Sequence, residues 1–246
     1  MFGGLYCEID CNQDHDTVVN DIARIIKLKG KSNASRRPPR VLIVGAPGSG
    51  KSTLGELIAS KFNLVYVSTA NLLNSQIACK TEIGNTVAEL MREGELITDN
   101  VIVDLIKERL NQQDCRVNGW VLEGFPKTES QMNMLKTMKI PVSLVVVLQI
   151  DDDIVYERHE YKKIDPVTGK VYDLKGMEEL DEEVLERLVT KDSDKHEIVK
   201  KRLRVWKEFL PKLEETFKEH RLSLNADRTI ESLAESISEA IENSID

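Results

Sequence analysis

Short runs of apolar, often β-branched residues recur along the chain and are separated by segments long enough to form helices. The runs lie at 41–44, 64–67, 118–122, 143–150 and 221–224. Continuous apolar runs of this length, in place of strict apolar and polar alternation, are typical of parallel strands that are buried on both faces. The alternation of strand and helix therefore predicts an α/β fold, with a parallel sheet covered by helices on both faces.

The N-terminal part of the chain follows a different pattern. Apolar residues recur at helical spacing within 17–28 and predict a helix there. The segment that follows, KGKSNASRRPPR at 29–40, indicates a linker, because its two prolines end any helix. We therefore expect an N-terminal extension and linker over 1–38, then one domain over 39–246. Whether the helix docks on that domain, mediates dimerisation or stands free is left open by the pattern.

Composition and charge narrow the class of protein. The chain is 41% hydrophobic and 31% charged, as is usual for a globular protein, and its formal net charge of −8 argues against a general nucleic-acid binder. The longest apolar run, 142–150, is far shorter than the roughly 20 residues of a membrane helix. The first residues, MFGGLYCEID, lack the basic start and apolar stretch of a secretory signal. We expect a cytoplasmic protein with no nucleic-acid or membrane partner.

The cysteines, histidines and acidic residues could bind metals or take part in catalysis, but their spacing indicates no such site. The cysteines match no zinc or disulfide framework, so we expect reduced structural thiols at Cys7, Cys11, Cys79 and Cys115. A metal site or bridge at the first two is the weaker alternative. The histidines do not cluster, and we expect surface positions for His15, His159, His196 and His220. The acidic segment 177–187 predicts a solvated helix, and Trp206 and Phe209 predict core anchors.

A glycine-rich turn joins the first apolar run to a helical pattern over 51–62. The residues GAPGSGKS at 45–52 match G-x-x-x-x-G-K-[ST] between a strand and a helix, as that motif requires. Its glycines allow successive backbone N–H groups to form a nest for phosphate oxygens at a helix N-terminus. We expect Lys51 to reach the β- and γ-phosphates and the Ser52 hydroxyl to help hold Mg²⁺. The alternative, a glycine-rich turn that binds nothing, is disfavoured by the complete motif.

Further stretches resemble the adenylate kinase family, and the resemblance extends from about residue 40 to the end of the chain. They are GAPGSGKST (45–53), VSTANLL (67–73), GELITD (94–99), GWVLEGFPKT (119–128), DPVTGKVY (165–172), and KDSD (191–194) leading into KRL (201–203). Together their order and spacing are specific. The residues QQDC at 112–115 and the DPVTG loop also look like single domains of the long adenylate kinases of motile cilia.

The resemblance implies a P-loop NTPase fold with a five-stranded parallel sheet and two inserts. The monophosphate-binding insert would span 68–98 and the lid 158–190, with a hairpin that turns at Gly169. The lid contains none of the cysteines, so it is not of the zinc-clamped kind. The implied activity moves the γ-phosphoryl group of ATP, with Mg²⁺, to AMP and gives two ADP. The implied protein is a monomer whose partners are these nucleotides.

Roles on the triphosphate side follow from the same resemblance. Arg158 would stack on the adenine and reach the phosphates, and the backbone carbonyl near Arg228 would accept from that base. The phosphates would be held by the loop residues Gly45, Pro47, Gly48, Ser49, Gly50, Lys51, Ser52 and Thr53. The transferred group would be surrounded by the cations Lys51, Arg158, Lys162, Lys191 and Arg202. Such a transfer depends mostly on positioning and on stabilising charge spread over the equatorial oxygens.

On the acceptor side the resemblance implies a pocket for the monophosphate base. Thr69 would hydrogen-bond the base, and Gln131 would read its adenine edge. The backbone at Ile97 would line the pocket, and Gly124 would begin the turn that approaches the base.

The chain departs from the family at several charged positions. The family usually has arginine where this chain has Asn74, Lys127, Lys162 and Lys191, and aspartate where it has Asn71 and Glu123. The last of these positions usually orders water bound to Mg²⁺. Arginine offers a planar, two-pronged donor to phosphate, lysine keeps only the charge, and asparagine loses it. We therefore expect a kinase with weakened acceptor binding; the alternatives are a nucleotide-binding module with little turnover and a kinase for another monophosphate.

Overall fold

The computed structural model describes residues 18–19, 38–93, 97–138, 140–175 and 180–244. The chain divides into two units, one of residues 1–37 with residue 246 and one of residues 38–245. In the first unit only Val18 and Val19 are described, and both are helical, so the rest of the helix predicted at 17–28 lies outside the described residues. The second unit contains the sheet and both inserts.

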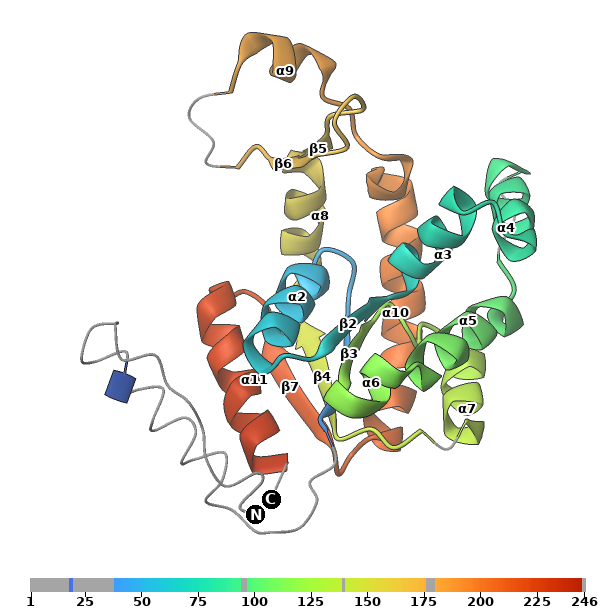
Figure 1. The fold of residues 1–246 in the computed structure, drawn as a ribbon. Coiled ribbons are helices and arrows are strands. Elements are labelled where there is room, and N and C mark those ends of the chain that lie inside the picture. Colours follow the sequence, from blue (N-terminus) through green and yellow to red (C-terminus); the bar gives the residue numbers. More distant parts are fainter. Residues whose placement is uncertain (1–17, 20–37, 94–96, 139, 176–179, 245–246) are drawn as a thin grey trace, which may run out of the picture. The chain divides into compact units, whose positions relative to one another are not determined.

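A five-stranded parallel sheet forms the centre of the second unit (Figure 1). Its strand order is β2-β3-β1-β4-β7, which places β1 in the middle. The strands are β1 Arg40–Gly45, β2 Val65–Ser68, β3 Trp120–Glu123, β4 Leu144–Gln149 and β7 Arg221–Asn225. Each corresponds to an apolar run of the sequence, so the predicted α/β fold is confirmed.

Helices cover both faces of this sheet (Figure 1). They are α2 Lys51–Phe62, α5 Asp99–Asn111, α6 Gln113–Asn118, α7 Glu129–Thr137, α10 His196–Thr216 and α11 Ile230–Ser244; α8 Asp152–Tyr161 packs against α10 and leads into the second insert. Neighbouring residues of a strand point to opposite faces, so β1 contributes Ile43 to the apolar layer under α2 and α11, and Leu42 to the layer under α5, α7 and α10. Both side chains are fully buried, which explains why the strand is apolar throughout.

The first insert is a helical hairpin of α3 Thr69–Ala78 and α4 Glu82–Glu93. The two helices cross so closely that a Cβ atom at Gly84 would lie 2.0 Å from the carbonyl oxygen of Gln76. Only glycine fits at this crossing, so the sequence fixes the contact between the helices at that point. The hairpin lies between β2 and α5 in the chain, where the monophosphate-binding insert is predicted.

The second insert contains the hairpin of β5 Lys162–Ile164 and β6 Val171–Asp173, followed by α9 Glu182–Arg187 and the 3₁₀ helix η1 Asp192–Asp194. The strands are antiparallel, and Gly169 lies in their turn with a φ of 73°, which confirms the predicted hairpin. The chain after α9 returns to this hairpin, since Ile164 and Val189 form a β-bridge. Of the acidic segment 177–187, residues 182–187 form α9, which contains no buried residue, as predicted for a solvated helix; residues 177–179 lie outside the described residues.

A buried carboxylate holds the lid together. Asp165 is completely buried and accepts hydrogen bonds from the Val167 N–H at 2.9 Å and from the Thr168 hydroxyl at 2.8 Å. Arg187, at the end of α9, donates to the same carboxylate at 2.8 Å. This guanidinium holds the pKa of Asp165 well below its usual range. The hairpin turn and α9 are therefore joined through one side chain.

The other sequence expectations have mixed outcomes. Phe209 is buried and Trp206 packs beside it, so both contribute to the core as predicted. Cys115 is a buried free thiol, but the free thiol of Cys79 is exposed and packs in no core; Cys7 and Cys11 lie outside the described residues. Within the described ranges no helix has the length and apolar character to cross a membrane, and no cluster of His, Cys, Asp or Glu side chains is arranged to hold a metal ion.

Candidate functional site

The loop between β1 and α2 has the backbone geometry of a phosphate nest. Gly48 and Gly50 have φ values of 72° and 83°, in the left-handed region that favours glycine. Gly50 caps the start of α2, so the first N–H groups of that helix point out of its N-terminus. The Ser49 hydroxyl donates to the carbonyl oxygen of Ala46 at 2.8 Å and closes the loop on itself. Together, the nest and the positive end of the helix dipole favour an anion here.

Lys51 is the charge at the centre of this loop. Its Nζ donates to the carbonyl oxygen of Ala46 at 2.5 Å. The pKa of Lys51 is lowered to about 7, mainly by burial; Glu123 opposes this effect, and the neighbouring cations Arg202, Lys127 and Lys162 add to it. Cations from the lid, from α10 and from the end of β3 therefore act on one lysine. Because these positive charges repel one another, the binding of a polyanion such as a chain of phosphates between them is favoured.

Two lid-side residues contribute to this cluster. Lys162, at the start of β5, places Nζ 3.4 Å from the buried carboxylate of Asp194. Arg202 on α10 donates to the carbonyl oxygen of Ser193 at 3.1 Å. Both contacts are to η1, so this short helix positions the two cations predicted to surround the transferred group. Lys191 precedes η1 and has an exposed side chain; its predicted role stays a prediction.

Arg158 on α8 joins the glycine loop to the loop that follows β7. Its Nη1 donates to the carbonyl oxygen of Gly48 at 3.0 Å, and its Nη2 donates to that of Ala226 at 3.0 Å. Ala226 follows β7 and lies two residues before Arg228, whose carbonyl is predicted to meet the base. The Arg228 side chain turns away and donates to Ser232. The loop after β7 and the glycine loop are thus held together by one guanidinium.

His159 is not a surface residue, and that expectation is wrong. Its side chain is 5% exposed, and its ring lies so close to the glycine loop that a Cβ at Gly48 would approach Cε1 to 2.7 Å. Nδ1 lies 2.7 Å from the carbonyl oxygen of Val155, and Nε2 lies 3.8 Å from Asp194. Burial lowers the pKa of His159, with Lys162 adding to this effect and the Val155 carbonyl and Asp194 opposing it.

The sequence contains one sign of this burial. Val155 lies four residues earlier on the same face of α8 and is fully buried. The other two described histidines, His196 and His220, are exposed as predicted, and His15 lies outside the described residues.

The acceptor wall forms where β3 ends. The Thr69 hydroxyl donates to the carbonyl oxygen of Glu123 at 3.2 Å. Gly124 has a φ of 85°, and a Cβ there would lie 3.2 Å from the Thr69 hydroxyl oxygen, so the two residues touch. Ile97 is half-buried just before α5. The predicted base-binding residues Thr69 and Gly124 are therefore adjacent.

Gln131 supports this wall from α7. It is buried, its Oε1 accepts from the Lys127 backbone N–H at 2.7 Å, and its Nε2 donates to Asp99 at 2.7 Å. Thr128 accepts from the Gln131 N–H and caps α7. The residue missed from the sequence is Asp99, at the start of α5. Its sequence signals are its place at the end of the GELITD stretch and in the first turn of a helix.

The two departures on the acceptor side have different surroundings. Lys127 has an exposed side chain, yet desolvation and the charge of Arg202 lower its pKa, while Glu123 opposes them. Lys127 therefore belongs to the cation cluster around Lys51. Asn74 is exposed on α3, five residues after Thr69. Its predicted contact with the acceptor phosphate stays a prediction.

The two residues predicted to hold Mg²⁺ meet at a tyrosine. Tyr66 on β2 donates its hydroxyl to Glu123 Oε2 at 2.9 Å, and the Ser52 side chain interacts with the same hydroxyl. Carboxylate and hydroxyl oxygens are hard donors of the kind that Mg²⁺ prefers. The residues present therefore fit the ion, and Tyr66 is a further member of the site that the sequence did not reveal.

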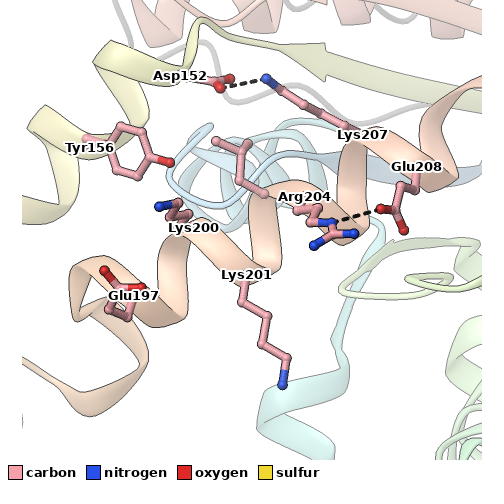
Figure 2. Close-up of a pocket in the computed structure, with 9 residues that line it drawn as sticks. Asp152, Tyr156, Glu197, Lys200, Lys201, Arg204, Lys207 and Glu208 are labelled. Carbon is pink, nitrogen blue, oxygen red and sulfur yellow. Dashed lines mark hydrogen bonds and ion pairs between the residues drawn. The ribbon is translucent and has the colours of Figure 1, made fainter.

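A pocket of about 610 Å³ lies between α8 and α10, outside this site (Figure 2). It is lined by Asp152, Tyr156, Glu197, Lys200, Lys201, Leu203, Arg204, Lys207 and Glu208. Two ion pairs neutralise part of its charge: Lys207 lies 2.5 Å from Asp152, and Arg204 lies 3.0 Å from Glu208. The Arg204 side chain is 82% exposed, so this pocket is a shallow surface feature with no built ligand site.

Comparisons with known proteins agree with this geometry. The family model for adenylate kinase matches residues 43–222, which include the glycine loop, both inserts and Arg202. The chain is 36% identical over 204 residues to the chloroplastic adenylate kinase of Zea mays, an alignment that covers 83% of this chain and 92% of that protein. It is 35% identical over 209 residues to the probable chloroplastic adenylate kinase 2 of Oryza sativa subsp. japonica, covering 85% and 72%. It is 36% identical over 168 residues to an adenylate kinase of Photorhabdus laumondii, covering 67% and 78%.

Proposed function

Because the chain belongs to the adenylate kinase family, we propose that its site transfers the γ-phosphoryl group of ATP to AMP and gives two ADP. The chain is a nucleoside monophosphate kinase of the P-loop fold, and its substrates are nucleotides. The observation that carries the proposal is the convergence of Arg202, Lys127 and Lys162 on Lys51. These cations come from separate parts of the chain and meet where the triphosphate side adjoins the acceptor wall.

The triphosphate is bound by the glycine loop. Its backbone N–H groups and Lys51 hold the β- and γ-phosphates, and Arg158 reaches them from α8. The Ser52 hydroxyl would help hold Mg²⁺, and Glu123 would act on the ion through bound water; the ion would supply charge neutralisation at the phosphate oxygens. Because Arg158 already contacts the loop carbonyl of Gly48 and the carbonyl of Ala226, it lies between the phosphate and base ends of this nucleotide.

The acceptor is bound against Thr69, Gly124 and Gln131, with its phosphate toward Lys127. An acceptor phosphate is already an oxyanion, so the transfer requires orientation more than a strong general base. Negative charge that spreads over the transferred group is stabilised by Lys51, Lys162 and Arg202. Closure of the lid over these groups excludes water, which would otherwise accept the phosphoryl group.

The chain has fewer charged groups for the acceptor phosphate than the family usually has. Lys127 supplies a point charge and Asn74 supplies none, so we infer that AMP binds weakly. A hydrogen bond to a charged group contributes about 1.5–3 kcal/mol, so the change at Asn74 alone corresponds to about a ten- to hundredfold loss in AMP affinity or rate. The cytoplasmic location and the monomeric state stay predictions, and both plant relatives are described as chloroplastic.

A coupled assay of ADP formation tests this function. Purified protein is mixed with ATP and MgCl₂, and with AMP, GMP, CMP, UMP or dAMP in turn. We expect AMP to give the highest rate. A faster reaction with another monophosphate would identify a different acceptor. If no monophosphate gives ADP although an unreactive ATP analogue binds, the chain is a nucleotide-binding module and the proposal is wrong.

A further inference from the structure

Tyr66 occupies a space that α2 leaves open for its ring. In the β2–β3 pairing, Tyr66 lies opposite Val121, and Glu123 lies two residues further along the same face of β3. A Cβ atom at Gly55 of α2 would lie 2.8 Å from the Tyr66 ring carbon Cε2. Gly55 is one turn from Ser52 on the same side of α2. The missing side chain at Gly55 therefore leaves room for the edge of the ring against α2.

The hydroxyl group of this ring connects β2, where Tyr66 lies, with Glu123 at the end of β3 and Ser52 on α2. Its hydroxyl donates to Glu123 Oε2 at 2.9 Å and interacts with the Ser52 side chain. A tyrosine hydroxyl is protonated at neutral pH, so this group is a donor to the carboxylate. Glu123 is also the acidic group that favours the charged form of Lys51. The Tyr66 hydroxyl therefore contacts the carboxylate whose charge acts on the loop lysine.

Glutamate has one more rotatable bond than the aspartate that the family usually has here. A longer carboxylate can adopt more orientations, and fixing one of them requires a partner. Groups that hydrogen-bond a metal-binding side chain set its direction, and their loss commonly weakens metal binding or activity about 10–100-fold. The Tyr66 hydroxyl is such a partner.

We propose that Tyr66 is a positioning residue for the phosphoryl-transfer site: its phenol fixes the Glu123 carboxylate beside Ser52 and the glycine loop, and Gly55 provides the room for the ring. The inference rests on the proposed function, because it concerns how that site binds Mg²⁺ together with the triphosphate. It gives a physical reason why glutamate can serve at this position.

The first test compares Tyr66→Phe with wild type in binding an unreactive ATP analogue, the β,γ-imido triphosphate. Isothermal titration is run without MgCl₂ and over a series of MgCl₂ concentrations. Mg²⁺ should increase the affinity for the analogue. We expect Tyr66→Phe to need about ten times more MgCl₂ than wild type to reach half of this increase, and to have nearly the wild-type affinity without Mg²⁺. Tyr156→Phe is the matched control, since it removes a hydroxyl from a half-buried tyrosine on α8. Its Mg²⁺ dependence should equal that of wild type.

A double-mutant cycle then identifies the partner of the phenol. Glu123→Asp shortens the side chain and should lose the contact with Tyr66. Adding Tyr66→Phe to Glu123→Asp should therefore change the Mg²⁺ dependence much less than it does in wild type. Thermal melting shows whether each variant stays folded.

Two outcomes would overturn the inference. One is an unchanged Mg²⁺ dependence in Tyr66→Phe; the other is an equal loss of analogue binding with and without Mg²⁺, which would mean that Tyr66 only supports the fold. The Mg²⁺ dependence of analogue binding is measured without turnover. A wild type that binds the analogue with Mg²⁺ but forms no ADP would refute the proposed function and leave this test intact.

Discussion

The Nζ atom of Lys51 lies 2.5 Å from the carbonyl oxygen of Ala46, five residues earlier in the same loop. This hydrogen bond holds the lysine along the glycine loop, where the β- and γ-phosphates are expected. The cations Arg202, Lys127 and Lys162 act on the same side chain. Lys51 is therefore the residue whose removal should most directly disable transfer.

Replacing Lys51 by alanine should abolish phosphoryl transfer. The loop would lose its charge on the β- and γ-phosphates, and loss of such a transition-state contact should exceed about 1.4 kcal/mol, or tenfold in rate. The measurement is kcat and kcat/KM in the ADP-formation assay. Lys107→Ala, which removes an exposed lysine from α5, is the control and should keep the wild-type rate. More than about a tenth of the wild-type rate in Lys51→Ala would contradict the role given to this residue.

A two-substrate mimic should stabilise the protein more than AMP does. Two adenosines joined by five phosphates would span the glycine loop and the acceptor wall, and would bring Lys162 and Arg202 onto the shared phosphates. A ligand that binds only the folded state raises the melting temperature by mass action, so the mimic should raise it well beyond AMP at the same concentration. Lys51→Ala should lose most of this difference. Equal shifts with AMP and the mimic would argue against a site with two nucleotide positions.

Replacing Asn74 by arginine should tighten AMP binding. We expect a wild-type Michaelis constant for AMP in or above the upper part of the usual range of about 1 μM–1 mM, because Asn74 brings no charge to the acceptor phosphate. Asn74→Arg should improve AMP affinity and leave the unreactive ATP analogue nearly unaffected. Isothermal titration with each ligand measures both. Adding Lys127→Arg should help further, and more than additively if both side chains contact one phosphate.

The matched control for this experiment is Ser75→Arg. It adds the same charge to the next exposed position of α3, which points to a different side of the helix. If wild-type AMP binding is already tight and Asn74→Arg leaves it unaltered, other residues bind the phosphate. The acceptor side would then need to be reassigned, and another monophosphate would become the stronger candidate.

His159 should make the folded state less stable in mild acid. Burial lowers its pKa below the ordinary 6.5, so between that value and the lower pKa of the folded state the unfolded chain binds more protons. The free energy of unfolding should therefore rise with pH up to about 6.5. Denaturant unfolding at several pH values between 5 and 8 measures this slope. His159→Gln should flatten it, while His220→Gln, at an exposed histidine, should not. Equal slopes in His159→Gln and wild type would show that His159 contributes nothing to it.

The strands and the glycine loop could be predicted because their signals are local. Buried parallel strands require uninterrupted apolar runs, and the loop requires glycines at Gly48 and Gly50 for its left-handed backbone. The hairpin of the lid was predicted in the same way from Gly169. These features depend on residues that are close together in the sequence.

Other features depend on contacts between residues that are far apart in the sequence, and local patterns contain almost no sign of them. His159 is buried because α8 packs its face against the glycine loop, and the one sign of this in the sequence is Val155, four residues earlier on the same face of α8. Tyr66 and Glu123 are 57 residues apart and meet only because β2 and β3 are neighbours. The resemblance identified the positions of Asn74 and Lys127 as unusual, but the consequence for AMP requires the measurements above.

The contact between Asp165 and Arg187 sets the conditions under which the lid keeps its shape. The lid segment contains no cysteine, and its hairpin is joined to α9 by one charge pair and short polar contacts. The lid segment has no thiol, and its described residues form no metal site, so chelators and thiol oxidants have no target there. Acid can break the ion pair between Asp165 and Arg187. Arg187 keeps the pKa of Asp165 low, so the pair stabilises the lid at neutral pH and is lost only as the pH falls well below 3.8. The lid should therefore keep its shape without zinc and under conditions that oxidise thiols.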